Sequence, residues 1–237
     1  MQARRVPLSP DSLVSVCREL LHEGGPEAIV VREVARRASV TAPALYKHVD
    51  GRHELLTLLI AACSNEVADA CATAREACDP DDFTAQLFSA TAAFRSWSLA
   101  NRPEFGLIYG TPITGYQAPA EGPSTESFRR FGAVFAQIYL GLLSTDRLRL
   151  ADRDSMSPQL IAAITAKPLP GGHHLPPEAA YQFAVGWHRL LGMVSVEIAG
   201  HLDWMMDDSD AFMQRQVEAL GTEMITAKTA KGSTNNV

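Results

Sequence analysis

The sequence has few aromatic residues and no long apolar run. Aromatic side chains make up 7% of its 237 residues, whereas alanine and leucine are abundant, a composition that favours helices over sheets. The longest apolar stretch, residues 55–63, is far shorter than the roughly 20 residues that a membrane-spanning helix needs. Prolines and polar residues follow Arg4 and Arg5, where a signal peptide requires an apolar segment. We therefore expect a cytoplasmic protein with no membrane partner.

Cysteine is also scarce, and the sequence lacks metal-binding spacing. The four cysteines, at positions 17, 63, 71 and 78, form no C-x-x-C pair and are expected to be buried in helices. His173 and His174 are adjacent in a Gly/Pro-rich loop, and the acidic cluster at residues 203–210 lacks EF-hand spacing. We expect neither a metal nor a cofactor.

Motifs of the common enzyme classes are missing as well. The chain has no G-x-S-x-G, no G-x-x-x-x-G-K-[ST], no G-x-G-x-x-G and no H-E-x-x-H sequence. A helical enzyme is therefore the least favoured class of function.

Charge is distributed unevenly along a chain whose net charge is −6. Residues 1–62 hold eight basic and seven acidic side chains, and the other 175 residues hold thirteen and twenty. A near-neutral first region and an acidic second region are consistent with two parts that have different electrostatic tasks.

Apolar periodicity and capping residues predict an all-α chain. Ser9 is a candidate N-cap with Pro10 at the first helical position, and Thr41 is a second candidate N-cap. Helices are expected over residues 9–22, 31–38, 41–48, 52–78, 81–100, 103–109, 125–147, 177–202 and 208–226, with a further short helix at 158–166. The helix at 52–78 is expected to connect a domain at 1–51 with a helical domain at 79–226, and residues 227–237 are expected to form a frayed tail.

Two short helices separated by a tight turn have the shape of a helix-turn-helix DNA reader. Apolar residues on both sides of the turn can close one small core, which leaves the first half of the second helix exposed. Small side chains there allow close approach to the major groove, and polar ones can contact phosphates. The predicted DNA-binding residues are Arg32, Thr41, Ala42, Pro43, Ala44, Tyr46, Lys47, His48 and Arg52.

The same residues carry a resemblance to a known family. Residues 32–49 read REVARRASVTAPALYKHV and residues 52–56 read RHELL, which resembles the N-terminal domain of the tetracycline-repressor (TetR/AcrR) family. The resemblance implies a homodimeric repressor whose second helical domain binds a small molecule. It also implies DNA-contacting positions at Thr41, Pro43, Tyr46, Lys47, His48 and Arg52.

The sequence departs from the family pattern at two positions of the predicted DNA reader. Ser39 stands where the turn usually has glycine, and a positive φ there would cost about 1 kcal/mol. Val30 stands where a Ser or Thr cap usually begins the second helix. A second, weaker resemblance covers residues 102–112, RPEFGLIYGTP, and the later Gly186-Trp187-His188. It points to family members with a Trp-His-Gly signature, although Arg189 replaces the final glycine.

The last two predicted long helices are the candidate dimer interface. The helix at 177–202 is apolar almost all round, and the helix at 208–226 has a narrow apolar seam. Pairing with a symmetry mate as a four-helix bundle would also place two DNA readers at neighbouring half-sites. The predicted interface residues are Val194, Ile198, Met213, Val217, Leu220 and Met224.

Aromatic residues with polar tips in the second region indicate a pocket for a hydrophobic or aromatic effector. The predicted ligand-binding residues are Trp97, Phe105, Tyr109, Trp187 and His188. A DNA-binding dimer with no small-molecule effector is the alternative, and the sequence does not separate the two.

Overall fold

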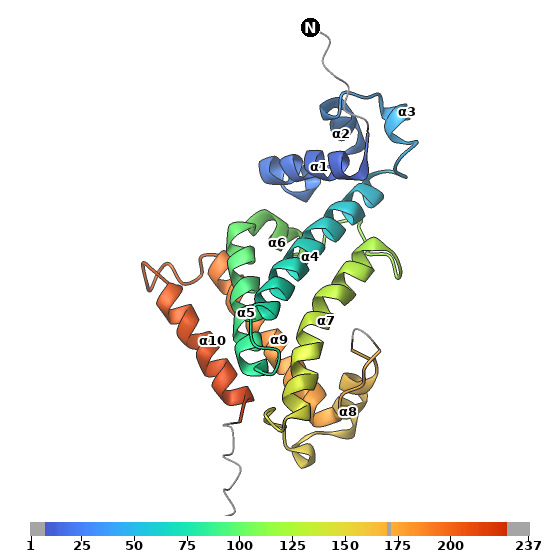
Figure 1. The fold of residues 1–237 in the computed structure, drawn as a ribbon. Helices are drawn as coiled ribbons and strands as arrows, with labels where there is room; N and C mark the ends of the chain where they lie inside the picture. The colour runs from blue at the N-terminus through green and yellow to red at the C-terminus, as the bar shows by residue number, and fades with distance from the viewer. Residues whose placement is uncertain (1–7, 170–171, 227–237) are drawn as a thin grey trace, which may run out of the picture. The chain divides into compact units, whose positions relative to one another are not determined.

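The structure is a computed structural model that describes residues 8–169 and 172–226. Within these residues the chain is helical, without a strand, and the prediction of an all-α fold is confirmed (Figure 1). One isolated β-bridge joins Leu148 to Ile225. The helices are α1 (Pro10–Gly24), α2 (Val31–Arg37), α3 (Ala42–Leu45), α4 (Arg52–Glu76), α5 (Phe83–Ala100), α6 (Arg102–Tyr109), α7 (Pro123–Ser144), α8 (Pro158–Thr165), α9 (Pro177–Ile198) and α10 (Asp210–Met224). Short 3-10 helices lie at Pro26–Ala28 and Arg153–Ser155. The predicted tail at 227–237 lies outside the described residues.

Local capping explains where α1 begins. Ser9 has an extended backbone, and its hydroxyl accepts a hydrogen bond from the Ser12 backbone N–H at 3.2 Å. The Ser12 hydroxyl in turn accepts from the Ser9 N–H at 2.9 Å, which completes a capping box. Pro10 occupies the first turn, where a backbone N–H has no helical partner. Val30 gives α2 no side-chain cap, as the sequence indicates.

The described chain divides into two compact units. The first unit comprises residues 8–70 and 94–131, and the second comprises residues 71–93 and 132–226. This division differs from the predicted domain boundaries, because residues 94–131 pack with the N-terminal helices. Residues 94–131 include the end of α5, all of α6 and the start of α7.

The core of the first unit joins α1, α2, α3 and the first half of α4. It is mainly aliphatic and includes Leu13, Leu20, Val34, Leu45 and Leu56, all almost completely buried. Leu107 of α6 belongs to the same cluster, and α1 contacts both α2 and α6. The helix-turn-helix core therefore includes a residue from far along the sequence.

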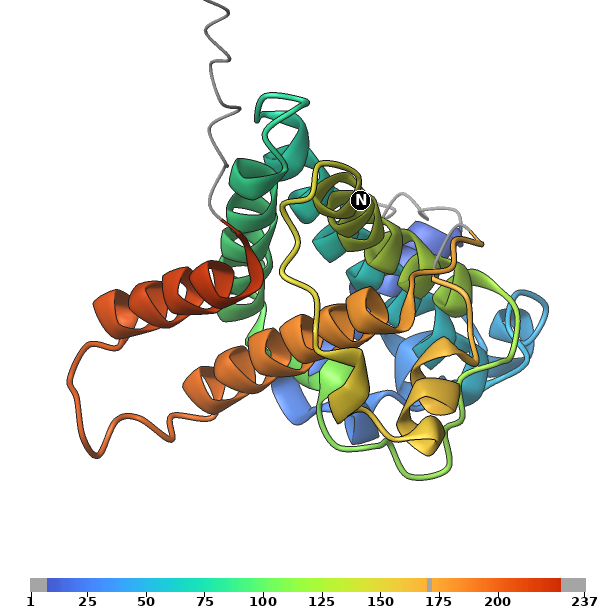
Figure 2. The same cartoon turned by 90° about the horizontal axis from the view of Figure 1, so that it is seen from below.

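The second unit depends on close approach between helices. In this unit α9 contacts both α8 and α10, and the loop at 199–209 joins α9 to α10 (Figure 2). A Cβ atom on Gly186 of α9 would collide with the Tyr139 hydroxyl on α7 and with Met224 on α10. The glycine of the Gly-Trp-His run is therefore a packing residue that lets three helices meet.

Helix α4 is apolar and long enough, by length and composition alone, to cross a membrane, but most of that stretch is buried in the molecule. Its apolar residues, such as Leu55, Leu56 and Leu59, lie in the core of the first unit. The apolar composition of α4 is therefore explained by its place in the core of the first unit.

Candidate nucleic-acid interface

Helices α2 and α3 are joined by a tight turn, as the sequence pattern predicts. Val34 and Ala35 are buried on α2, and Leu45 is fully buried on α3. The Val40 N–H donates to the Ala35 carbonyl at 3.0 Å, which closes the turn. Ser39 has a φ of 55°, so the position that favours glycine is occupied by serine in the left-handed region.

Helix α3 is shorter than the sequence predicts. Thr41 caps it, because its hydroxyl accepts from the Ala44 N–H at 3.3 Å. The helix ends at Leu45 instead of residue 48, a correction to the predicted range. The Lys47 N–H then donates to Ala44 and the His48 N–H to Leu45, which is the tighter pattern of a 3-10 turn.

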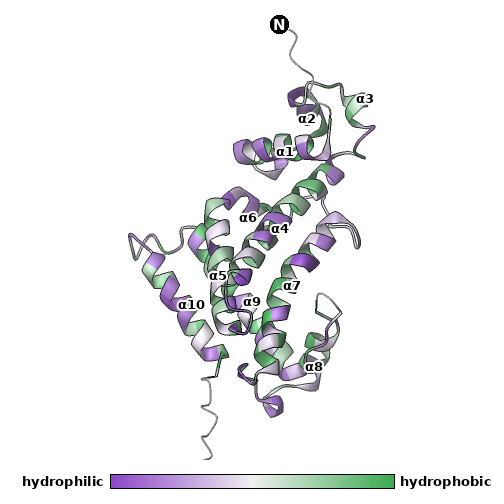
Figure 3. Ribbon diagram, viewed as in Figure 1, coloured by the Kyte–Doolittle hydropathy of each residue, from purple (hydrophilic) through white to green (hydrophobic). Residues whose placement is uncertain are grey.

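One side of α3 and of the turn after it is exposed. Tyr46 is 55% exposed, and the small apolar residues of α3 give it the pale green colour of Figure 3. The predicted DNA-binding residues Thr41, Pro43, Tyr46, Lys47 and His48 are exposed, and Ala42 and Ala44 are half-buried. The structure therefore brings all seven together on one short segment that Leu45 anchors.

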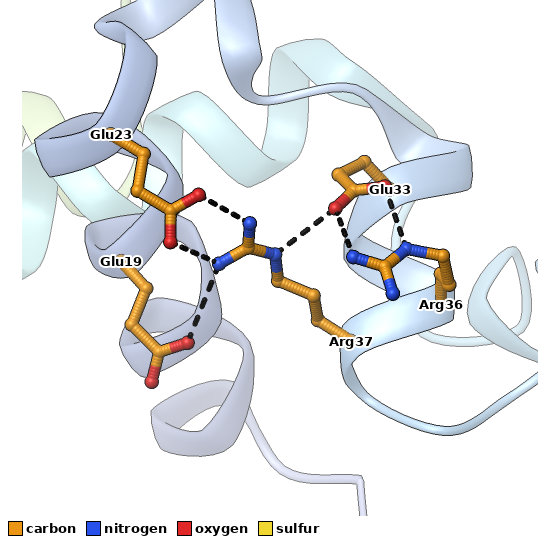
Figure 4. A network of polar contacts seen from close by, with 5 residues as sticks. All are labelled: Glu19, Glu23, Glu33, Arg36 and Arg37. Carbon is orange, nitrogen blue, oxygen red and sulfur yellow. Dashed lines mark hydrogen bonds and ion pairs between the residues drawn. The ribbon is translucent and has the colours of Figure 1, made fainter.

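Helix α2 uses its charges within the chain (Figure 4). The Arg37 guanidinium lies between Glu19 and Glu23 of α1 and Glu33 of its own helix, with an Nη1–Oε1 distance of 2.7 Å to Glu23. Arg36 donates twice to Glu33, at 2.6 and 2.9 Å. Hydrogen bonds from Arg36, and then from Arg37, lower the pKa of Glu33 to about 2. Arg37 therefore ties α2 to α1, whereas Arg36 is paired within α2.

Two basic residues of the helix-turn-helix are not neutralised in this way. Arg32 and Lys47 are exposed, and in the part of the chain that the structure describes no carboxylate pairs with either. Lys47 follows α3 directly, so its charge is located at the exposed face.

Arg52, a predicted DNA-binding residue, makes several contacts within the chain. Its guanidinium donates to the carbonyls of Ile29 and Pro26, each at 3.0 Å, and to that of Thr114 at 3.4 Å. It also forms an ion pair with Glu27 at 3.0 Å. These contacts hold the start of α4, and the Arg52 side chain remains about a quarter exposed.

The loop between α6 and α7 also contacts the start of α4, which no sequence signal indicates. The Tyr116 ring packs against His53 with a centroid distance of 4.7 Å, and its hydroxyl lies 3.1 Å from that of Thr57. The His53 imidazole contacts the Gln117 carbonyl at 2.7 Å. A loop rich in Gly, Pro and Thr has no periodicity from which this packing could be inferred.

The structure brings two of the predicted ligand-binding residues together. Phe105 and Tyr109 of α6 have ring centroids 5.2 Å apart. They belong to an aromatic cluster in the first unit, which also contains Phe94, Phe128 and Phe131. Trp97 packs on the aliphatic core of the first unit, whereas half-buried Trp187 and exposed His188 lie in the second unit.

Three of the predicted dimer residues are buried within their own chain. Val194, Met213 and Met224 are almost completely buried, which corrects their assignment to the interface. Met224, for example, accepts a 3.6 Å hydrogen bond from the Tyr139 hydroxyl. Part of the α10 seam is therefore covered within its own unit, by α9 and by Tyr139 of α7. Ile198, Val217 and Leu220 are half-buried.

Three of the four cysteines are buried. Burial raises the pKa of Cys17, Cys63 and Cys71 to about 12, so these side chains stay in the thiol form. No group of three or more metal-ligating side chains gathers within residues 8–169 and 172–226.

Comparisons with known proteins agree with this architecture. A model of bacterial regulatory proteins of the tetR family matches residues 13–58, and a model of the tetracyclin repressor-like C-terminal domain matches residues 87–220. The HTH-type transcriptional regulator Rv1816 of Mycobacterium tuberculosis is 28% identical over 193 residues, which cover 79% of this chain and 80% of that protein.

Two solved structures share the fold. A bacterial regulatory protein of the tetR family from Rhodococcus RHA1 is 16% identical, with a TM-score of 0.56 over 92% of this chain and 98% of that one. A TetR variant from Acinetobacter baumannii AYE in complex with minocycline is 19% identical, with a TM-score of 0.53 over 91% of this chain and 96% of that one.

Proposed function

This chain belongs to the tetR family of bacterial regulatory proteins, and from that premise we propose that it is a repressor that binds a palindromic operator as a homodimer. The exposed face of α3 carries the proposal. It combines small apolar residues with Tyr46, Lys47 and His48 on a segment that Leu45 fixes to the core. Such a segment can enter the major groove of DNA, where base edges are read. The regulator acts where chromosomal DNA is present, in the cytoplasm.

The roles within this face follow from chemistry. Ala42, Pro43 and Ala44 keep the leading edge of α3 narrow, so that the backbone can approach the bases. Thr41, Tyr46 and His48 provide hydrogen-bond donors for phosphates, and Lys47 reaches a phosphate or a guanine edge. Arg32 supplies a second phosphate contact from the exposed side of α2.

Selection of duplexes from a random-sequence library, followed by fluorescence anisotropy, tests the proposal. The selected sites should be inverted repeats, and affinity should fall steeply with salt because phosphate contacts release counterions. Replacement of Tyr46 by alanine should weaken binding while the protein stays folded. Selection of no common sequence, or unchanged affinity in the variant, would contradict the proposal.

We propose that the dimer forms through the outer side of the α9–α10 pair. Val196 on α9 and Phe212 on α10 are 39% and 41% exposed, and Gly192 and Ala199, one helical turn before and after Val196, are exposed too. Small residues let a second helix approach closely, and the two large apolar side chains gain free energy when a partner covers them. Half-buried Ile198, Val217 and Leu220 are expected to lie at the edge of this interface.

Analytical ultracentrifugation distinguishes this face from others. Val196→Glu should shift the protein from dimer to monomer, because a carboxylate would be buried without a partner. Leu160→Glu on α8, at a position of similar exposure, should leave the dimer intact. A monomeric wild-type protein at micromolar concentration, or a dimeric Val196→Glu variant, would rule the interface out.

We further propose that the aromatic cluster around Phe105 and Tyr109 receives a small hydrophobic or aromatic effector. The TetR structure that holds minocycline supports a small organic ligand for a protein of this fold. Thermal-shift screening against a diverse library should find compounds that raise the melting temperature and also release DNA. If no compound does either, the alternative of a DNA-binding dimer without an effector is favoured.

A further inference from the structure

Glu104 of α6 is an acidic residue with almost no solvent exposure, at 1%. Two basic residues of α1 approach its Oε1 atom, although they lie more than 80 positions earlier in the chain. The His22 Nε2 atom is 2.7 Å away, and the Arg18 Nη1 atom is 3.6 Å away. The proposed DNA contacts and the proposed dimer interface use none of these three residues.

A carboxylate in this position is poorly compensated. Its Oε2 atom is buried and has no hydrogen-bond partner among the residues that the structure describes. Buried ion pairs with incomplete hydrogen bonding add little stability compared with apolar residues of similar size. Orientation of the helices is the role that such a group can fill, because it fixes where its partners lie.

The partners of Glu104 connect α1 to a second helix. The Arg18 guanidinium also donates to Glu66 of α4 at 2.5 Å and to the Cys63 sulfur at 3.6 Å. One side chain of α1 therefore contacts α4 and α6 together. Beside this polar cluster, Leu107 of α6 enters the aliphatic core.

Rotation of α1 would be passed on to α3. Arg37 ties α1 to α2 through Glu23, and Leu45 ties α3 to the same core. The aliphatic core joins α1, α2 and α3, so the contacts that α1 makes with α4 and α6 help to set the direction in which α3 points.

We propose that Glu104 is a positioning residue for DNA recognition, which holds the helix-turn-helix at a fixed angle on α4 and α6 through His22 and Arg18. The inference rests on the proposed function, because the angle matters only if α3 reads DNA. In a dimer, two α3 segments must reach half-sites about 34–36 Å apart, so the angle determines which half-site spacing is accepted.

The test is binding to duplexes in which the two half-sites of the selected operator are moved apart or together by one or two base pairs. Wild-type protein should prefer one spacing by about tenfold or more, the scale of a mismatched base pair. His22→Ala and Glu104→Gln should flatten this preference to about twofold, because the angle is no longer fixed. Affinity for a duplex with a single half-site should not change, since α3 itself is intact.

Two further variants separate positioning from general loss of stability. His22→Gln keeps a hydrogen-bond donor and should restore the spacing preference. Asp69→Asn removes an exposed ion pair of the first unit, with Arg130, and should leave the preference unchanged. Because His22 is half exposed, its alanine variant carries the test if Glu104→Gln fails to fold.

The two possible failures are distinguishable. If the wild-type protein selects no duplex, the proposed function fails, and the positioning role fails with it. If the wild-type protein prefers one spacing and folded His22→Ala keeps the same preference, the positioning role alone is wrong.

Discussion

Helices α2 and α3 are neighbours joined by one turn, yet their surfaces differ. The cations Arg36 and Arg37 of α2 are paired with carboxylates of α1 and α2. No charged residue lies within α3, and Lys47, just after it, has no carboxylate partner among residues 8–169 and 172–226. The comparison shows that basic residues close together in the sequence can differ in whether a carboxylate neutralises them. Arg37 holds α2 on α1, whereas the polar groups that follow α3 are exposed.

The largest expected effect comes from detaching α3 from the core. Leu45→Ala should lower the free energy of unfolding by about 2–5 kcal/mol, because Leu45 is fully buried and its loss leaves a cavity. Urea unfolding measures this change. Tyr46→Ala, one residue later and exposed, is the control and should change stability by no more than about 0.5 kcal/mol. If both variants lost the same free energy of unfolding, the idea that Leu45 anchors α3 while Tyr46 lies on a free face would be wrong.

Removing one charge from α2 and one from the turn after α3 sharpens the comparison. Lys47→Ala should weaken operator binding about tenfold and reduce the salt slope by about one, because one phosphate contact is lost. Arg36→Ala makes the same change in charge on α2 and should alter both quantities much less. Fluorescence anisotropy at several salt concentrations measures them. If the salt slope falls by the same amount in both variants, net charge determines binding, and the exposed face of α3 does not.

A substitution in the turn between α2 and α3 should have a smaller effect, on the free energy of unfolding. Ser39→Gly should raise the free energy of unfolding by up to about 1 kcal/mol, because φ is 55° and glycine adopts this conformation without strain. Asp146→Gly, at the other described non-glycine position of positive φ, should gain less, because aspartate tolerates the left-handed region better. No gain for Ser39→Gly in urea unfolding would show that the turn is not strained.

The smallest effect concerns Glu33, the carboxylate that pairs with Arg36 and Arg37 on α2. The pKa of Glu33 falls from an ordinary 4.5 to about 2, so its ionised form favours the folded state. This contribution is complete above about pH 4.5 and disappears as the pH falls through about 2. The difference in urea midpoint between the wild type and Glu33→Gln should therefore shrink steadily over this range. A difference in urea midpoint that stays constant with pH would show that the charge of Glu33 contributes nothing to the stability of the fold.

Short-range signals predicted much of the fold and most of the exposed face. Ser9, Thr41 and the spacing of apolar residues located α1 and α3, and the exposed positions of α3 follow from the same pattern. The helix ends were less accurate, since α3 stops at Leu45 where hydrogen bonds change to the 3-10 pattern. Helix ends depend on a few weak bonds, which composition does not specify.

By itself, the sequence determined the all-α character, the helix-turn-helix and the face that α3 exposes, because capping and helical periodicity are local. Only the tertiary structure decided the contacts of Arg52, Glu104 and Met224. Each of these is set by partners far along the chain: Arg52 by Ile29 and Thr114, Glu104 by α1, and Met224 by α7. A side chain's burial and its hydrogen-bond partners depend on which helices fold against it, and local periodicity does not record that information.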